Sequence, residues 1–513
     1  MSGADFMAQY VSGMSLNERN GGSGKPESTT ADSSAPAKVV FIDEKDAISS
    51  EGDDVFPTGP MPEPRMKDSE LIRKMSTIKG SVKREGSQTL PTIEYSDASD
   101  IEVIHEADKV FISLPWQKIV KLPVLQEAVG KGTTKYFSEV HIDLQGSTLK
   151  GDVFDASALS ETNECMFIIE NGVVEFREIV KLISKSKLHE LDILAGADGC
   201  TLVDCNLEME VCSVIGVGTF TIGAGSVVCM TDCEVTEAKE VGIVVAGGNL
   251  SGKRSKFVDH GFENMLVKDG GMATLTQCDF IGSKTAEGLT VEGKGTTVTV
   301  TKSTFINNET SSMMISDGAF AKVEDCVCFN SQTESGFEAR GKGTKVKLLR
   351  CEFLNSNLHG VLVRGCAAVT VEELLCRGSK GSGMIVEGKG SNVTAISSIF
   401  ADNVQNGVGV GYYATGMFRG CTMSGSKEGA GVEAGGYGTD LNMISCKVSD
   451  NNMSGIVVRD GALAALRDVV SSGSKEGCGL EVDGSGTEVW VTRGEYTDNP
   501  EGGVITTEGR VIG

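Results

Sequence analysis

The chain has 513 residues, of which 65 are glycine and only 5% are aromatic, and its formal net charge is -24. Glycine is well above its usual share of about 7%, which suits a fold with many turns around a thin aliphatic core. Such an acidic chain is unsuited to free nucleic acid or to an anionic membrane surface, because both require a basic face. We therefore expect neither as a partner.

Targeting signals and metal motifs are missing from the sequence. The first 30 residues contain no continuous apolar core, and no stretch approaches about 18 consecutive apolar residues, so we expect an intracellular, cytoplasmic protein. The 15 cysteines are an odd number, and none form pairs with metal-binding spacing. This pattern favours reduced, buried thiols, and we expect no metal site and no cofactor.

Residues 1–100 are predicted to be a disordered tail. Serine, glycine, proline and acidic residues dominate this region, so it cannot bury enough apolar surface to offset the entropy of ordering. A short helix is predicted over residues 68–80, with Asp68 as its cap. This basic segment is a solvated charged stretch, a peptide docking motif or a kinase substrate; Ser76, which follows Arg73 and Lys74, is the candidate phosphorylation site.

Residues 101–135 are predicted to contain an N-terminal strand and a capping helix. The sequence DKVFISLPW indicates the strand, and LPVLQEAVGKG indicates a short amphipathic helix from Leu122 to Val129, closed by Gly130 and Gly132. We expect this helix to cover the apolar end of the repeat array that follows.

Residues 136–513 read as one repeat array. Rows such as GLTVEGKGTTVTVTKSTFINNETS and GFEARGKGTKVKLLRCEFLNSNLH start at 288, 312, 336, 360, 383, 407, 431, 455, 479 and 503, so every step is 24 residues except one of 23. Nine of the ten prolines lie at or before Pro123 and the tenth is Pro500, which leaves the array free to form continuous sheet. The pattern predicts an all-β, single-stranded parallel β-helix solenoid with about 24 residues per coil.

Each row has an opening strand, a glycine turn, a second strand, a cysteine or apolar residue followed by phenylalanine, and a polar turn. Two columns of the opening strand are predicted to point inward, and the recurring cysteines are predicted to form a buried stack. Recurring turn asparagines are predicted to hydrogen-bond along the axis. The first inward column comprises Leu289, Met313, Phe337, Val361, Met384, Val408, Val432, Ile456 and Leu480; the second comprises Val291, Ile315, Ala339, Val363, Val386, Val410, Ala434, Val458 and Val482. The cysteines are Cys233, Cys278, Cys326, Cys351, Cys376, Cys421 and Cys446, and the asparagines are Asn307, Asn355, Asn403 and Asn451.

These rows resemble the right-handed parallel β-helix repeats of the pectin-lyase-like superfamily. The superfamily includes polysaccharide lyases, polygalacturonases and epimerases, and also intracellular β-helix domains without hydrolytic chemistry, such as those of some F-box and SHC-binding proteins. The regular rows with GKGT turns look closer to the second, non-catalytic type. The resemblance covers about residues 136–510 and implies the fold without implying an activity.

No catalytic set is apparent. The array has neither the Gly-His-Gly motif of polygalacturonase-like enzymes nor the arginine motif of pectate-lyase-like enzymes. Asp259-His260-Gly261, the nearest fragment, falls in a polar turn, and His359 is predicted to be a solvated turn residue. Long insertions normally carry active sites, and this array has almost none. We expect no catalytic residues.

The outward side chains of the opening strands form the predicted binding surface. Apolar and basic side chains are predicted to lie together there, with tyrosines on nearby coils that could stack on sugar rings; scattered surface side chains are the alternative interpretation. The candidate residues are Met314, Arg340, Leu362, Arg364, Ile385, Tyr412, Tyr413 and Tyr437.

Three functions remain open from the sequence. The first is a non-catalytic scaffold that binds a protein partner through an outward strand face. The second is a carbohydrate-active enzyme, such as a lyase, hydrolase or epimerase, with a divergent site. The third is a structural protein that self-associates end to end through an uncapped C-terminal coil, since an uncovered sheet edge invites pairing.

Overall fold

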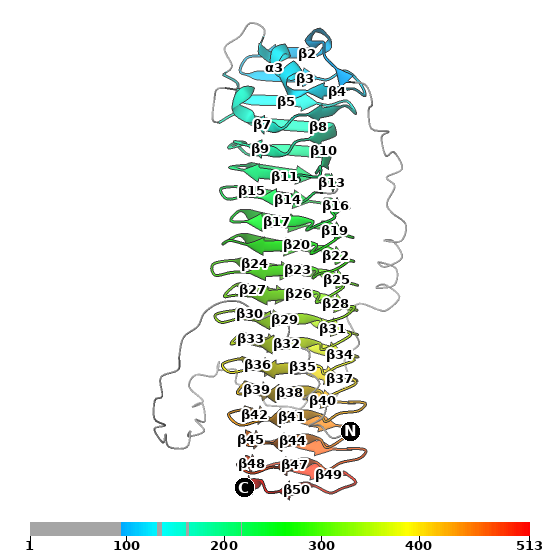
Figure 1. The fold of residues 1–513 in the computed structure, drawn as a ribbon, viewed down its shortest axis with the longest axis vertical. Helices are drawn as coiled ribbons and strands as arrows, with labels where there is room; N and C mark the ends of the chain where they lie inside the picture. Colours follow the sequence, from blue (N-terminus) through cyan, green and yellow to red (C-terminus); the bar gives the residue numbers. More distant parts are fainter. Residues whose placement is uncertain (1–93, 131–135, 161–163, 217) are drawn as a thin grey trace, which may run out of the picture. The chain divides into compact units, whose positions relative to one another are not determined.

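The computed structural model describes residues 94–130, 136–160, 164–216 and 218–513. The predicted tail up to residue 93, including the helix at 68–80 and Ser76, lies outside the described residues. The described chain forms a parallel β-solenoid, as predicted (Figure 1). Each coil contributes three strands, whereas the sequence predicted two, because the segment that contains the recurring phenylalanine is also a strand. Strands this short are stable only because each pairs with its counterparts in the coils above and below.

The first strand of each coil belongs to a sheet of 16 parallel strands. Matching positions pair in register; Leu289 pairs with Met313, for example, which pairs with Phe337. These strands are β7 (Val153–Asp155), β9 (Glu178–Val180), β11 (Cys200–Val203), β14 (Phe220–Ile222), β17 (Ile243–Ala246), β20 (Met265–Lys268), β23 (Leu289–Glu292), β26 (Met313–Ser316), β29 (Phe337–Arg340), β32 (Val361–Arg364), β35 (Met384–Glu387), β38 (Val408–Gly411), β41 (Val432–Gly435), β44 (Ile456–Arg459), β47 (Leu480–Asp483) and β50 (Val504–Thr507).

The second and third strands of each coil belong to a sheet of 35 strands. The second strands are β3 (Lys109–Ser113), β5 (Glu139–Asp143), β12 (Asn206–Glu210), β15 (Val227–Thr231), β18 (Asn249–Lys253), β21 (Met272–Thr276), β24 (Thr297–Thr301), β27 (Phe320–Glu324), β30 (Lys345–Leu349), β33 (Ala368–Glu372), β36 (Asn392–Ile396), β39 (Thr415–Arg419), β42 (Asp440–Ile444), β45 (Leu463–Arg467), β48 (Glu488–Thr492) and β51 (Arg510–Ile512). The longer strands β8 (Met166–Glu175) and β10 (Ser186–Leu194) serve as both second and third strand.

The third strands stack along the right-hand edge in Figure 1. They are β1 (Glu94–Tyr95), β4 (Ile119–Lys121), β6 (Thr148–Lys150), β13 (Ser213–Ile215), β16 (Glu234–Thr236), β19 (Lys256–Val258), β22 (Asp279–Ile281), β25 (Thr304–Ile306), β28 (Val327–Phe329), β31 (Glu352–Leu354), β34 (Leu375–Arg377), β37 (Ile399–Ala401), β40 (Thr422–Ser424), β43 (Lys447–Ser449), β46 (Val470–Ser472) and β49 (Glu495–Thr497).

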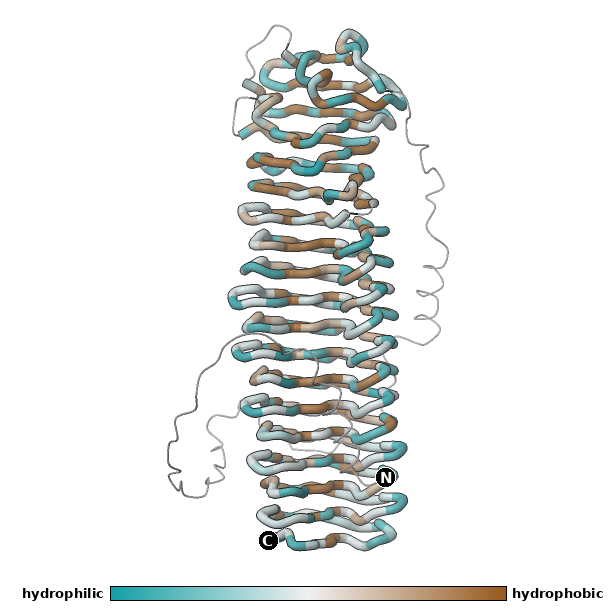
Figure 2. Tube along the Cα trace, viewed as in Figure 1, coloured by the Kyte–Doolittle hydropathy of each residue, from teal (hydrophilic) through white to brown (hydrophobic). Residues whose placement is uncertain are grey.

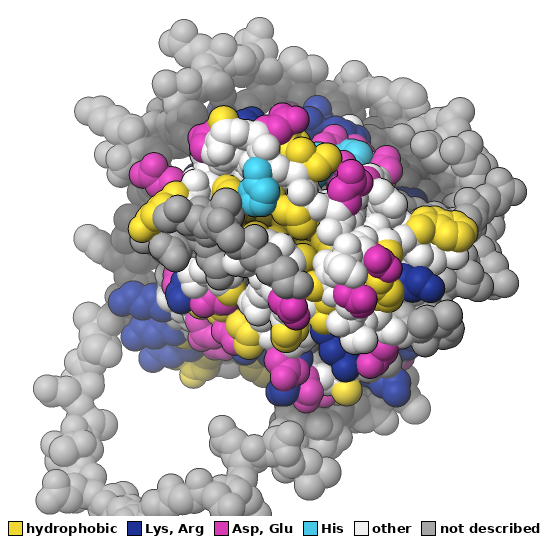
Figure 3. Space-filling model, turned by 90° about the horizontal axis from the view of Figure 1, so that it is seen from above, with side chains coloured by type: hydrophobic (Ala, Val, Ile, Leu, Met, Phe, Trp, Pro, Cys, Tyr) yellow, Lys and Arg dark blue, Asp and Glu magenta, His cyan; other side chains and the backbone are white. Residues whose placement is uncertain are grey.

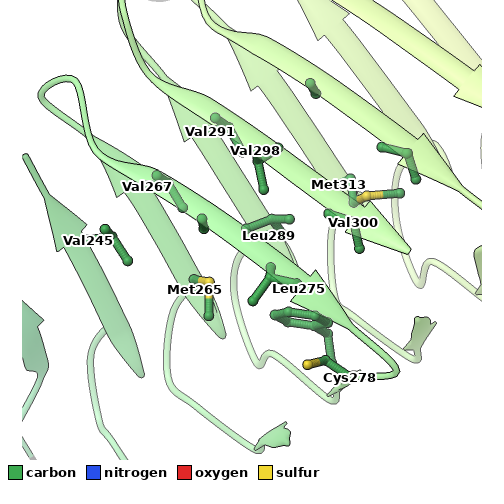
Figure 4. Packing of buried hydrophobic residues seen from close by; sticks show 14 of the residues in the cluster. Val245, Met265, Val267, Leu275, Cys278, Leu289, Val291, Val298, Val300 and Met313 are labelled. Atoms are coloured by element: carbon green, nitrogen blue, oxygen red, sulfur yellow. The ribbon is translucent and has the colours of Figure 1, made fainter. Parts of the chain in front are cut away.

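The core is a set of axial columns, as the repeat predicts. No member of the two predicted inward columns is more than 3% exposed. Figure 4 shows members of both columns, such as Leu289 and Met313 of the first and Val291 of the second, pointing into the interior toward second-strand residues. Third-strand phenylalanines also stack, and the ring centroids of Phe280 and Phe305 are 4.6 Å apart. Figure 2 shows the result as hydrophobic segments within the strands and hydrophilic ones at the turns.

The bend between the second and third strands explains the cysteine repeat. A residue with positive φ makes the bend, and the next side chain points inward; Asp325 (φ 54) precedes Cys326, for example. The Sγ of Cys326 donates to a backbone oxygen of its own coil, that of Glu324, at 3.3 Å, and burial raises the pKa of Cys278 to about 11. The seven predicted cysteines of the stack are buried, with one correction: Cys376 lies within the third strand β34, not at the bend. The wider prediction of buried thiols is wrong for Cys366, which is exposed, and for Cys229, which is half-buried.

The turns between first and second strands interlock in alternate coils. Coils with a Gly-x-Gly-Thr turn present the threonine or serine hydroxyl to a backbone N–H of the shorter turn in the preceding coil. The N–H of Gly318, for example, donates to Oγ1 of Thr344 at 3.0 Å, and that of Gly461 to Oγ1 of Thr487 at 2.9 Å. This pairing is the physical reason for the weak 48-residue period within the 24-residue repeat.

The polar turn between the third and next first strand contains a buried ladder of serine and asparagine. The Oδ1 of Asn403 accepts the N–H of Ser379 at 2.9 Å, and that of Asn451 accepts the N–H of Ser426 at 3.0 Å. The predicted set of ladder asparagines was partly wrong. Asn307 and Asn355 occupy the positive-φ position that comes just before the buried ladder position. The buried ladder instead includes Asn308 and Asn499.

Two histidines in this turn, His260 and His359, are also buried, which corrects the prediction that His359 is a solvated turn residue. His260 is 0% exposed and His359 4%. His359 Nδ1 accepts the backbone N–H of Ser382 at 3.0 Å. It thus accepts a backbone hydrogen bond from the next coil, as polar side chains of this turn do in other coils. Burial lowers the pKa of both side chains to about 4.

The N-terminal end of the solenoid carries the predicted helix. Helix α3 (Leu122–Gly130) buries Leu122, Leu125 and Val129 near the 3-10 helix η1 (Ala98–Asp100). Strand β2 (Glu102–Glu106) pairs antiparallel with β3, and η2 (Ala156–Ala158) follows in the first coil. Seen from this end in Figure 3, charged side chains surround hydrophobic ones. Strand β1 and η1 lie within the last residues assigned to the tail by sequence.

Candidate binding surface

The predicted binding residues lie on or beside the first strands, but they do not form the exposed apolar patch that was expected. Met314 is only 7% exposed and Leu362 only 4%, and Ile385 is half-buried. The in-register pairing places Glu338 between Met314 and Leu362 in one outward column. The expectation that Met314 and Leu362 are exposed is therefore wrong.

The two predicted basic residues are paired with an acid on the same face. Arg364 Nε donates to Glu338 Oε1 at 2.9 Å, and Arg340 Nη1 lies 3.6 Å from the same oxygen. The Glu338 side chain is only 2% exposed, so this carboxylate needs the cationic partners that it has. This pairing leaves the face close to neutral and poorly suited to capture an acidic polysaccharide.

The three predicted tyrosines are exposed and lie at the turns that follow two neighbouring first strands. Tyr412 is 42% exposed, Tyr413 51% and Tyr437 75%. The rings of Tyr413 and Tyr437 meet edge to face, with centroids 6.2 Å apart. The structure thus brings together these three residues, whose ring surfaces are accessible.

The backbone under Tyr412 and Tyr413 is unusual. Both have positive φ, 54° and 66°, a region that bulky side chains enter at a cost of the order of 1 kcal/mol each. Asp460 and Gly461 occupy the matching positions two coils later, and they suit that conformation far better. A strained pair of exposed aromatic residues is a reason to suspect function.

Beside the tyrosines, the outer face of two first strands carries no side chains at three positions. Gly409 and Gly411 lie on β38 and are buried, and Gly435 on β41 is half-buried; all three are in outward columns. The side chain of Ile385 reaches toward Gly409 on one side and that of Arg459 toward Gly435 on the other. We call Tyr412, Tyr413, Tyr437 and the three glycines the tyrosine shelf.

A second surface was missed by sequence reasoning. Each third strand has three residues, and its middle one points into the core; the flanking positions of several successive coils are apolar and nevertheless buried. They form a hydrophobic cluster separate from the main core, which we call the third-strand face. It comprises Val258, Ile281, Ile306, Val327, Leu354 and Leu375, with Phe329 and Ile399 packed against it. Reading the third strands as columns would have revealed it.

The described residues contain no group of three or more histidine, cysteine or acidic side chains that could hold a metal ion. Glu263 and Glu287 lie on neighbouring coils, and the pKa of Glu287 is raised mainly by burial and also by repulsion from Glu263. No helix in the described part of the chain has the length and apolar character needed to cross a membrane.

The family model for the right-handed β-helix region matches residues 216–343 and 335–496, which together span more than half of the chain. The chain belongs to this family. No curated protein matches the β-helix chain significantly.

Solved structures with a similar fold include the periplasmic alginate epimerase AlgG, with 9% identity, a TM-score of 0.27, and coverage of 79% of this chain and 85% of that one. The A-module of the mannuronan C-5 epimerase AlgE6 from Azotobacter vinelandii has 12% identity and a TM-score of 0.30, with coverage of 76% and 95%. A hyper-glycosylated TibA fragment has 15% identity and a TM-score of 0.28, with coverage of 71% and 99%. At these values the matches carry no argument about activity.

Proposed function

We propose that this β-helix protein is a non-catalytic scaffold that binds a protein partner through the tyrosine shelf. The observation that carries the proposal is the strained, exposed pair Tyr412 and Tyr413 beside a strip of strand without side chains. Tyrosine supplies large, rigid contact area and is enriched in interfaces.

Charge favours a protein over an acidic polysaccharide. Arg364 is neutralised by Glu338, and Arg459 by Glu433, in a chain whose formal net charge is -24. A polyuronate chain would meet net repulsion from a chain this acidic. A neutral sugar that stacks on the tyrosines is the second candidate, and it is favoured by the accessible rings of Tyr413 and Tyr437.

The test uses a substitution that copies a turn of the same solenoid. Tyr412→Asp with Tyr413→Gly reproduces the turn formed by Asp460 and Gly461, so the coil should fold. Gly411→Leu, at a position without positive φ, should cover the shelf. Asp483→Leu, in the same outward column three coils away, is the matched control.

Tagged wild type and variants would be used to capture partners from extracts of source cells, with quantitative mass spectrometry. We expect a protein retained by the wild type and by Asp483→Leu, and reduced at least tenfold by both shelf variants. Equal capture by all four proteins would contradict the proposal. Binding of a neutral glucan that the shelf variants abolish would favour the carbohydrate alternative instead.

Catalysis is tested on the unmodified protein with alginate and polygalacturonate. We expect no unsaturated product at 235 nm, no new reducing ends and no epimerisation by NMR; any of these would favour the enzyme hypothesis. End-to-end self-association through the C-terminal coil, where β50 ends the 16-stranded sheet, also remains a proposal. Light scattering on the same samples would show oligomers that Val504→Lys removes.

A further inference from the structure

The third-strand face lies on the outside of the solenoid. On β25, Phe305 points into the core and Ile306 points the other way, yet Ile306 is 0% exposed. Leu354 on β31 is 4% exposed and Leu375 on β34 is 6% exposed in the same outward columns. An outward side chain on a single sheet becomes this inaccessible only when something lies over it.

The same columns are polar or accessible elsewhere in the solenoid. Toward the C-terminal end they hold Thr422 and Ser424 on β40, both half-buried, and Glu495 on β49, which is exposed. Toward the N-terminal end they hold Glu234 on β16, also half-buried. Ser449 on β43 is also buried, but the stretch in which buried outward side chains are apolar is confined to the coils from β19 to β37. At about 4.8 Å per strand, it extends about 29 Å along the axis.

Among the described residues, no helix or strand packs over the third-strand face. Every described strand except β2, which pairs with β3 at the N-terminal end, belongs to one of the stacked columns, and α3 contacts η1 and β4 at that same end. A sheet that is apolar on both sides is normally covered on both sides, because exposed apolar surface is unfavourable in water. The occupant must come from another part of this chain or from another molecule.

We propose that the segment of residues 66–80, N-terminal to the solenoid, docks on the third-strand face as an intramolecular strap. The chain enters the solenoid at Glu94 in β1, and β1 is the first strand of the third-strand column, paired with β4. The tail therefore begins at the end of the face that it would cover.

The distances allow this path. Strand β19 is seven strands from β1 in the column and β34 is twelve, which correspond to about 34 and 58 Å. The 14 residues from Gly80 to Glu94 span up to about 48 Å when extended. Residues 66–80 thus reach the middle of the face without strain.

The chemistry of the segment matches the face. Leu71, Ile72 and Met75 provide apolar side chains at short spacing within the segment. Residues 65–84 contain seven Lys or Arg and two Asp or Glu, a net of +5 (7 minus 2), in a chain of net -24. The outward columns from β19 to β37 are mainly apolar, and their charged side chains balance, with Asp279 and Glu352 against Lys256 and Arg377. The apolar side chains of the segment are therefore what fits it to the face.

Hydrogen–deuterium exchange on the full-length chain tests the strap. We expect amides of residues 68–80 to exchange at least tenfold more slowly than those of residues 20–34, an internal control rich in glycine and serine. Leu71→Asp with Ile72→Asp, which leaves the solenoid unchanged, and Ile306→Lys on the face should both remove the protection. Ser424→Lys, in the same outward column on β40, should retain it. Equal exchange of the two segments in the wild type would overturn the proposal.

Photo-crosslinking identifies the occupant. Benzoylphenylalanine in place of Phe329, at the edge of the face, is expected to crosslink to residues 66–80 of the same chain. A mixture of isotopically light and heavy protein distinguishes this from a second copy. Crosslinks to another tail segment, or between light and heavy chains, would overturn the proposal. Met75→Asp, which places a charge among the apolar side chains of the segment, should lower the crosslink yield severalfold.

Discussion

The second and third strands belong to the same sheet and are separated by one short bend, yet their outer sides differ. Thr299 on β24, Lys322 on β27 and Lys347 on β30 point outward, and all three are at least partly exposed. On the third strands of the same coils, Ile306 and Val327 point outward and are buried. Alternation of apolar and polar residues marks a face for solvent, whereas apolar residues on both sides mark a strand between two layers.

The comparison shows that a solenoid with a uniform core does not have uniform faces. Inward positions must be apolar in every coil, because like side chains stack on like. Outward positions are free to vary, so a local departure from polar side chains requires its own explanation. In this protein the departures are the third-strand face and the tyrosine shelf, and both lie outside the columns that specify the fold.

The largest effect on stability should come from substitutions on the core-facing side of the third strands. Phe305→Ala should lower the free energy of unfolding of the coils around it by about 3–5 kcal/mol, because it leaves a cavity in the phenylalanine stack. Ile306→Ala should cost about 2 kcal/mol if its outer side is covered, and Thr299→Ala less than about 0.5 kcal/mol. Urea denaturation followed by circular dichroism compares them. A cost for Ile306→Ala as low as that for Thr299→Ala would mean that the two outer sides are alike.

Acid should weaken the corner that joins the third-strand and first-strand faces. His359 has a pKa of about 4 in the folded chain and about 6.5 when unfolded, so between these values the unfolded state binds more protons. Stability should be unaffected above pH 6.5 and should fall as the pH drops toward 4, by up to about 3 kcal/mol for this residue.

The control for this pH effect is His359→Asn. Asn406 holds the same place two coils later and accepts the backbone N–H of Ala430 at 2.9 Å, so asparagine should replace the hydrogen bond without titrating. Thermal melts of both proteins at several pH values between 4 and 7 provide the comparison. If the wild type and His359→Asn lose stability in parallel, the buried histidine is not the cause.

The smallest effect on stability should come from the tyrosine shelf. Tyr412→Asp with Tyr413→Gly relieves two strained residues but loses the contact between Tyr413 and Tyr437, and glycine adds entropy to the unfolded chain. We expect a change within about 1 kcal/mol, measured by the midpoint of urea unfolding. A loss above about 3 kcal/mol would show that the tyrosines serve the fold, and would weaken the case for binding.

The sequence predicted the inward columns well because the steps of 23 or 24 residues and the alternation within each strand leave no other register. It predicted the outward surface less well. Met314 and Leu362 alternate with inward residues and therefore do point outward, but periodicity reports direction and says nothing about what lies above a side chain. For the same reason the sequence did not reveal that His260 and His359 are buried. Their turn is rich in hydroxyl and amide side chains, but these groups bond to the backbone rather than to water.

By itself, the sequence determined that this protein is a parallel solenoid with stacked apolar and cysteine columns and a helix at its N-terminal end, since each of these follows from local pattern and repetition. Only the tertiary structure decided which outward residues are accessible, that Arg340 and Arg364 share Glu338, and that β1 begins the column bearing the third-strand face. Those facts depend on contacts between residues about 24 positions apart or more, and on side-chain packing, which a one-dimensional pattern does not specify.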